Sequence, residues 1–195
     1  MAFRIGVDVD EVLAEFVQSF TAFHNERYGT RLGKDDFYVY RVSQVLGLPR
    51  EETRRRMEEF YESPRFENIE RVPGAKCGVA RLRQEHTLVL VTSRPAMLKA
   101  ATGRWVARHY GNAFQGTHFA DYSSNGNRLT KATICKRERL DLLIEDNADF
   151  ARECLDQGIP VIMPDRPWNE NSLPQSQYLM RDQSWKGIPA LVSNL

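Results

Sequence analysis

Short apolar runs alternate with amphipathic stretches along most of the chain. Runs rich in Val, Ile and Leu have the pattern of strands buried on both faces of a parallel sheet. They occupy residues 4–10, 87–91, 140–144 and 159–163, with a weaker strand at 117–120. Apolar residues at helical spacing predict helices between them, at about 79–84, 96–110, 132–136 and 147–157. This alternation predicts an α/β fold with a Rossmann-like parallel sheet, helices on both faces and right-handed crossovers.

The segment after the first strand breaks this rhythm. Three phenylalanines at helical spacing predict a helix that runs toward Gly29: Phe16, Phe20 and Phe23. Residues 30–72 are rich in charged and aromatic side chains and show no pattern of a buried strand. We therefore predict a small helical cap inserted after the first strand, and the predicted division is a cap of residues 15–73 and a core of residues 1–14 and 74–195. The tail from Trp168 onward is polar and ends in an amphipathic segment.

Composition narrows the class of protein. With 195 residues, 42% of them hydrophobic and 27% charged, the chain can bury one core with an insertion. A formal net charge of +1 gives no electrostatic reason to expect a nucleic-acid polymer or an anionic membrane as partner. The three cysteines lack the spacing of a zinc site or a disulfide framework, and no apolar run reaches the length of a membrane span. We expect a cytoplasmic protein, either a monomer or a homodimer.

Polar side chains follow three of the predicted strands. Asp8 and Asp10 end the first strand, Thr92 and Ser93 follow the second, and the acidic pair Glu145 and Asp146 follows a later one. Because parallel strands bring their carboxyl ends to one edge of a sheet, we expect these groups to meet there. Crowded carboxylates favour a hard cation such as Mg²⁺. Each pair alone is also consistent with a turn or a helix cap.

Two further groups suit a phosphorylated ligand. The hydroxyl groups after the second strand, together with backbone N–H groups entering the next helix, can hold phosphate oxygens. Lys131 begins the helix that leads to the acidic pair and can offset negative charge when phosphate binds. Taken alone, a lysine is most often only a solvated side chain.

These residues together resemble the four motifs of the haloacid dehalogenase superfamily. The motifs are Asp8-Val9-Asp10, the hydrophobic-Thr92-Ser93 run, a lysine before a later strand, and the Glu145-Asp146 pair. The stretch after Asp8 and the residues before Glu145 are similar to the 5'-nucleotidase and 5'(3')-deoxyribonucleotidase branch, which has a small helical cap after the first motif. Glu11 stands where glycine is usual in the family, and either Lys131 or Lys136 fits the lysine motif.

The resemblance implies an Mg²⁺-dependent phosphomonoester hydrolase that acts on a small phosphorylated substrate, a nucleoside monophosphate. Asp8 would be the nucleophile that forms an aspartyl-phosphate, and Asp10 would exchange protons with the leaving group and with water. The metal would be held by Asp8, the Asp10 backbone carbonyl, Asp146 and Glu145. The phosphoryl oxygens would be bound by Thr92, Ser93 and Lys131. The pocket for the rest of the substrate would include Phe16, Tyr38, Tyr40 and Arg94, although Phe16 also fits a core position.

Three other functions use the same residue types. A phosphatase of another small metabolite, or a phosphomutase, would share the core without a base pocket. A non-catalytic binding protein would keep the fold and lose the chemistry, but every motif position here holds a competent residue. A phospho-receiver domain carries its reactive aspartate on a middle strand and has no large helical insertion. In this chain Asp8 follows the first strand and a helical insertion comes next, which disfavours a receiver domain.

Overall fold

Six parallel strands form the sheet in a computed structural model that describes residues 1–122, 128–170 and 172–195. Their order is β3-β2-β1-β4-β5-β6, and each neighbouring pair is parallel. The strands are β1 (Arg4–Val7), β2 (Thr87–Thr92), β3 (Thr117–Phe119), β4 (Leu142–Ile144), β5 (Val161–Pro164) and β6 (Leu179–Asp182). The predicted parallel α/β sheet is confirmed. The first strand is central, with β2 on one side and β4 on the other.

Helices cover both faces of this sheet. Leu88 and Leu90 of β2 belong to one apolar cluster, whereas Val89 and Val91 belong to a second, because alternate residues of a strand point to opposite faces. The first cluster includes residues of α5 (Ala75–Leu82), α6 (Lys99–Tyr110) and α9 (Ile188–Ser193). The second includes residues of α7 (Lys131–Arg137) and α8 (Ala148–Leu155). The strands are therefore buried on both faces, as their continuous apolar sequence predicts.

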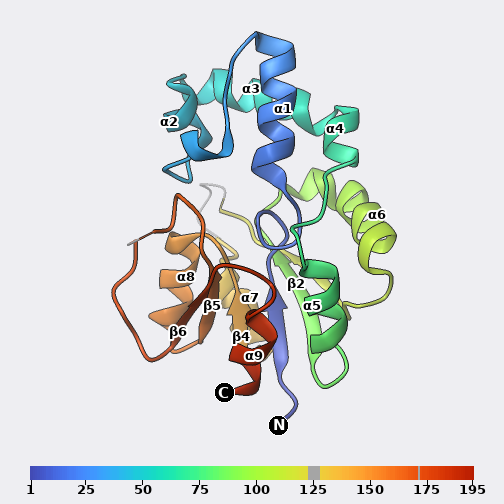
Figure 1. The fold of residues 1–195 in the computed structure, drawn as a ribbon, viewed down its shortest axis with the longest axis vertical. Coiled ribbons are helices and arrows are strands. Elements are labelled where there is room, and N and C mark those ends of the chain that lie inside the picture. The colour runs from blue at the N-terminus through green and yellow to red at the C-terminus, as the bar shows by residue number, and fades with distance from the viewer. Residues whose placement is uncertain (123–127, 171) are drawn as a thin grey trace.

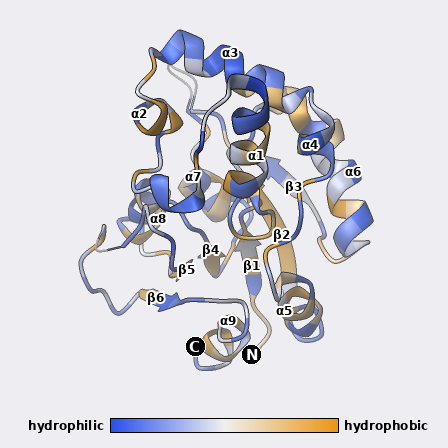
Figure 2. Cartoon of the chain, turned by 45° about the horizontal axis from the view of Figure 1, so that its top comes forward, coloured by the Kyte–Doolittle hydropathy of each residue, from blue (hydrophilic) through white to orange (hydrophobic). Residues whose placement is uncertain are grey.

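A group of helices, called the capping helices below, lies over one end of the sheet, at the top of Figure 1. It comprises α1 (Phe16–Tyr28), the 3-10 helix η1 (Lys34–Asp36), α2 (Val42–Leu46), α3 (Arg50–Tyr61) and α4 (Pro64–Glu67). Phe60 is fully buried among them, and its ring contacts four other phenylalanines: Phe16, Phe20, Phe23 and Phe66. Figure 2 shows α3 as mainly hydrophilic, and Phe60 is a buried apolar residue on this otherwise polar helix.

The helix predicted after the first strand is confirmed, whereas one strand was not predicted. α1 begins at Phe16 after a loop and ends at Tyr28, and Gly29 follows it with a φ of 66°. The polar tail contains the strand β6, which pairs with β5 from Leu179 to Asp182. All four residues of β6 are half-buried, and two of them are charged. An edge strand of this kind has no apolar run, which is why hydropathy did not reveal it.

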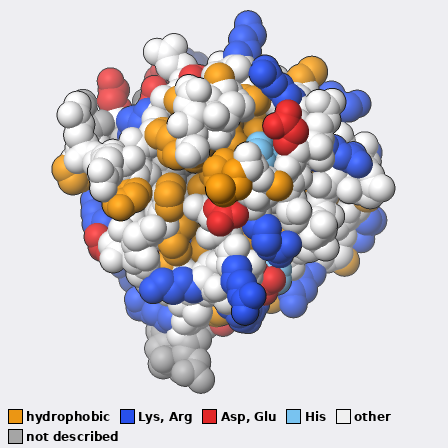
Figure 3. Space-filling model, turned by 90° about the horizontal axis from the view of Figure 1, so that it is seen from below, with side chains coloured by type: hydrophobic (Ala, Val, Ile, Leu, Met, Phe, Trp, Pro, Cys, Tyr) orange, Lys and Arg blue, Asp and Glu red, His pale blue; other side chains and the backbone are white. Residues whose placement is uncertain are grey.

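The surface carries charges of both signs. Figure 3 shows the end of the molecule that holds both termini, opposite the capping helices. An apolar area lies on this face, with Lys and Arg side chains around it and a few Asp and Glu side chains between them. Within the described residues, each helix is too short or too polar to cross a membrane.

Candidate active site

The strand register brings the polar motifs to one edge of the sheet. Val7, the last residue of β1, pairs with Leu90 of β2 and with Ile144 of β4. Asp8 therefore lies beside Glu145, and its backbone N–H donates to the carbonyl of Ile144 at 3.0 Å. β1 and β4 end at the same level, and β2 continues two residues further to Thr92, so all three strands deliver polar residues to the end of the sheet that lies under the capping helices (Figure 1).

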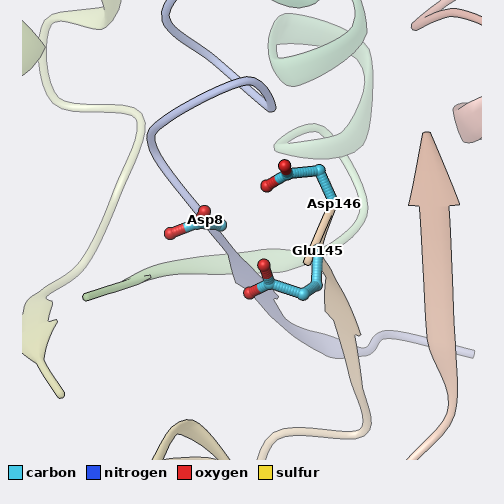
Figure 4. Close-up of side chains that lie close together, drawn as sticks. All are labelled: Asp8, Glu145 and Asp146. Atoms are coloured by element: carbon cyan, nitrogen blue, oxygen red, sulfur yellow. The ribbon is translucent and has the colours of Figure 1, made fainter. Parts of the chain in front are cut away.

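Three carboxylates converge at this edge. Asp8, Glu145 and Asp146 each offer an oxygen atom within 4.8 Å of the others, and all three residues are buried. Figure 4 shows them coming from the ends of two neighbouring strands, with the side chains of Glu145 and Asp146 directed toward Asp8. The acidic pair does not serve as the helix cap, because the side chain of Asn147 caps α8 by accepting from the N–H groups of Asp149 and Phe150.

Lys131 is the cation among these carboxylates. Its side chain is fully buried, and its Nζ lies 2.8 Å from Oδ1 of Asp8 and 2.5 Å from Oε2 of Glu145. Thr130 caps the helix that Lys131 begins, which fixes the lysine at the start of α7. Lys136, the other candidate from the sequence, is exposed near the end of the same helix. The structure therefore brings Lys131 to the carboxylates and leaves Lys136 on the surface.

Burial and like charges disturb the ionisation of the site. Burial raises the pKa of Asp8, against the opposing effect of Lys131. Burial also raises the pKa of Glu145, to about 7, again opposed by Lys131. The pKa of Asp146 is well above its usual value because of burial and then the neighbouring charges of Glu145 and Asp8. For Lys131 burial acts to lower the pKa, but Asp8 and Glu145 outweigh it and raise the pKa well above normal.

The donor set fits a hard divalent cation. Three buried carboxylates face one ammonium group, so negative charge is in excess. Oδ1 of Asp8 is buried and faces Nζ of Lys131. Oδ2 of Asp146 accepts from the indole N–H of Trp168 at 2.8 Å. Both oxygens of Glu145 are engaged, one by Lys131 and one by the N–H of Asn147. Oxygen donors of this kind, partly oriented by neighbours, are what Mg²⁺ prefers.

Asp10 lines the cavity next to this edge of the sheet and is held by Arg94. The guanidinium of Arg94 donates to both carboxylate oxygens of Asp10, with the shortest contact 2.6 Å from Nη2 to Oδ1. The hydroxyl of Thr92 is buried and accepts from the backbone N–H of Arg94 at 3.2 Å. Ser93 is half-buried and lines the adjacent cavity. Neither hydroxyl caps the next helix, since Pro95 occupies the N-cap of η2 (Ala96–Leu98).

Glu11 adopts a backbone conformation that glycine usually supplies. Its φ is 57°, in the left-handed region, which explains why glycine is usual at this position. Its side chain is buried, accepts from the N–H of Val17 at 2.7 Å and lies 3.1 Å from Nζ of Lys34. Arg166 donates to its carbonyl oxygen from two guanidinium nitrogens. These contacts hold the loop between Asp10 and α1 in place despite the unfavourable φ.

A cavity of about 270 Å³ opens between the strand ends and the capping helices. It is lined by Asp10 and Asp146 on the sheet side and by Phe16, Tyr40 and Arg94 among others. Phe16 also packs against Phe20 and Phe60, so it serves both the cap interior and the cavity wall. Tyr38 is 66% exposed and lies outside the residues that line this cavity.

Two tyrosines of the capping segment face the charged groups. Burial and the carboxylate of Asp146 raise the pKa of Tyr40 well above normal, although almost half of this residue is exposed. Burial and the carboxylate of Asp10 likewise raise the pKa of Tyr61. Tyr61 also lines the cavity. Both phenols are therefore neutral hydrogen-bonding groups at ordinary pH.

Sequence reasoning missed several residues of the site. Trp168 and Asn169 lie in the polar tail, yet they hold Asp146 through its carboxylate and its carbonyl oxygen respectively. Tyr61 is the last residue of a highly charged helix. One signal was available: Trp168 and Asn169 lie in the loop that follows the core strand β5, and ligand-site residues gather in such loops of parallel sheets.

Comparison with known proteins agrees with this geometry. The profile of a family described as "5' nucleotidase, deoxy (Pyrimidine), cytosolic type C protein" matches residues 2–192. The chain is 24% identical over 199 residues to a nucleotidase of Clostridium acetobutylicum, covering 98% of this chain and 94% of the relative. Its fold is similar to that of a haloacid dehalogenase-like hydrolase from Streptococcus pneumoniae, with a TM-score of 0.70, 12% identity and 98% of each chain covered. A similar match is the L-2-haloacid dehalogenase from Xanthobacter autotrophicus, with a TM-score of 0.68, 13% identity and full coverage of both chains. The resemblance to the haloacid dehalogenase superfamily is thus confirmed.

Proposed function

We propose a function from the premise that the chain belongs to the family of cytosolic type C 5' nucleotidases and is a hydrolase of the phosphatase type. The proposed function is hydrolysis of nucleoside monophosphates through an aspartyl-phosphate on Asp8. The observation that carries this proposal is the buried group of Asp8, Lys131 and Asp146, because Asp146 also lines a cavity whose walls include aromatic side chains. A nucleophile, a charge-neutralising lysine and a candidate metal site meet there.

In the proposed reaction a carboxylate oxygen of Asp8 attacks phosphorus while the bond to the leaving oxygen breaks. Asp10 gives its proton to that oxygen, and in the second step it takes a proton from the water that attacks the aspartyl-phosphate. Thr92, Ser93 and Lys131 bind the phosphoryl oxygens and neutralise their charge. In the second step the bond between phosphorus and the Asp8 oxygen breaks, and the proton taken from water restores the protonated form of Asp10. Phosphate and the nucleoside are the products.

Mg²⁺ is the cofactor that the carboxylates fit best. Asp8 and Asp146 are its proposed direct ligands, together with the backbone carbonyl of Asp10. Glu145 contributes its charge and holds Lys131 in place, because both of its oxygens already accept hydrogen bonds. When bound, the cation supplies charge neutralisation that lets an anionic carboxylate approach an anionic phosphate.

The cavity supports a mononucleotide as substrate. Its volume of about 270 Å³ is just below the range of about 300–1,000 Å³ that is usual for ligand pockets, which suits a substrate no larger than one nucleotide. Phe16 and Tyr40 line it and offer ring faces for a base. We propose the cytoplasm as its location, in keeping with the family description and with three free cysteines.

Phosphate release from a panel of substrates tests this function. The panel contains 5'- and 3'-nucleotides in ribo and deoxy forms, sugar phosphates and p-nitrophenyl phosphate, each with and without Mg²⁺. We expect Mg²⁺-dependent release that prefers nucleotides and is lost in Asp8→Asn. Preference for a sugar phosphate would indicate a phosphatase of another metabolite. Failure of the folded protein to release phosphate from every substrate would indicate a binding protein.

A further inference from the structure

Arg94 makes contacts on several sides at the mouth of the site. It is 4% exposed, although it lines the cavity. Its Nε donates to Oδ1 and Oδ2 of Asp10 at 3.1 and 3.0 Å, and its Nη2 donates to Oδ1 at 2.6 Å. A planar guanidinium that contacts both oxygens fixes the plane of the carboxylate as well as its position.

The opposite side of Arg94 is anchored as firmly. Its Nη1 donates to the hydroxyl of the fully buried Thr102 on α6, at 3.2 Å. Its guanidinium carbon lies 4.9 Å from the centre of the Phe66 ring and 6.0 Å from that of Trp105. Its backbone N–H is bound by Thr92. Moving the guanidinium toward a phosphate would break these contacts and would leave the partly buried carboxylate of Asp10 unpaired.

We propose that Arg94 is a positioning residue that acts through Asp10, and that it does not bind the phosphoryl group. This inference rests on the proposed function, in which Asp10 transfers protons. Oδ1 of Asp10 receives two of the contacts from Arg94 and Oδ2 receives one, so Oδ2 is the oxygen we assign to the proton. That proton passes to the leaving oxygen as its bond to phosphorus breaks, and the same atom later accepts a proton from water.

The dependence of rate on the leaving group separates the two roles. A nucleoside 5'-monophosphate releases a strongly basic alkoxide and needs a proton from Asp10, whereas p-nitrophenyl phosphate releases a weakly basic anion and needs little help. Because general acid catalysis contributes about 10²–10⁴-fold, Arg94→Met should lower kcat for the nucleotide by about 10²-fold or more. The loss for p-nitrophenyl phosphate should be less than about tenfold, with KM for both substrates little changed.

Several variants make the test specific. Arg104→Met removes an exposed arginine of α6 that pairs with Glu67, and it is the matched control that should behave like the wild type. Thr102→Val removes the anchor and should give a milder loss with the same preference for the better leaving group. In a double-mutant cycle, Asp10→Asn with Arg94→Met should lose no more nucleotide activity than Asp10→Asn alone.

The contrary results are distinct. Equal losses on both substrates, or a rise in KM with kcat preserved, would make Arg94 a phosphate ligand and overturn the inference while the proposed function stands. If Arg94→Met does not fold, the Thr102→Val variant decides by the same criterion, and unchanged leaving-group dependence there refutes the role. A wild-type protein that hydrolyses neither substrate refutes the proposed function itself, and the inference falls with it.

Discussion

Replacing Lys131 by Met should destabilise the protein strongly and in a pH-dependent manner. The side chain of methionine has a similar length and fits the same buried space, so the main change is loss of the ammonium group. That group lies 2.8 Å from Asp8 and 2.5 Å from Glu145, and all three side chains are shielded from water. Without it, two buried carboxylates repel each other and Asp146.

The magnitude follows from opposing contributions. At an effective dielectric constant of about 20, unit charges 2.8 Å apart attract each other by about 6 kcal/mol. The pair at 2.5 Å contributes about 7 kcal/mol on the same basis. Removing the lysine also removes its own desolvation cost of several kcal/mol, and the remaining carboxyl groups can bind a proton, so we expect a net loss of about 3–5 kcal/mol.

The pH dependence gives the sharper test. Without Lys131, the buried carboxyl groups of the folded variant hold protons that the unfolded chain has already released. For each such proton, the free energy of unfolding of the variant falls by about 1.4 kcal/mol for every unit that pH rises. Urea unfolding at about pH 5 and about pH 8, in chelator and in Mg²⁺, measures this. Lys136→Met, which removes an exposed lysine of the same helix, is the control. A loss below about 1 kcal/mol, or an equal loss at both pH values, would refute the reasoning.

Three further outcomes are expected. In chelator, the wild type should lose stability as pH rises from about 4.5 through about 7, because the folded-state pKa of Glu145 is raised. Mg²⁺ should restore the lost stability over that pH window. A melting temperature that rises with pH in chelator would contradict this prediction. Trp168→Phe removes the donor to Asp146, so Mg²⁺ binding by calorimetry should weaken by about 10–100-fold; unchanged affinity would count against the contact. Phe16→Ala should raise KM for nucleotides by the equivalent of about 1–3 kcal/mol and leave p-nitrophenyl phosphate unaffected, and equal effects on both would argue against base stacking.

Much of the site could be predicted because it is built from strand ends. The apolar runs before Asp8, Thr92 and Glu145 identify strands, and a parallel sheet brings their ends to one edge whatever the loops do. Lys131 was identified as a candidate by its place in the order of motifs, but only its burial between two carboxylates separates it from Lys136.

The remaining residues depend on tertiary contacts that leave no local pattern. Trp168 lies in a polar tail, and its indole reaches Asp146 only because β4 and β5 are neighbours. Arg94 was predicted as a pocket residue and lines the cavity, but its contact with Asp10, 84 positions away, leaves no local pattern in the sequence. Tyr38 and Tyr40 are two residues apart, but the first is exposed outside the cavity and the second lines it.

Detection of phosphorylated Asp8 tests the central claim most directly. The enzyme is mixed with a rapidly hydrolysed nucleotide and Mg²⁺, quenched in acid within one turnover and treated with borohydride, which reduces an aspartyl-phosphate to homoserine. Peptide mass spectrometry should find homoserine at position 8 in the wild type and none in Asp8→Asn. Phosphate release without any modification of Asp8 in the same quenched samples, or modification of another residue, would contradict the account.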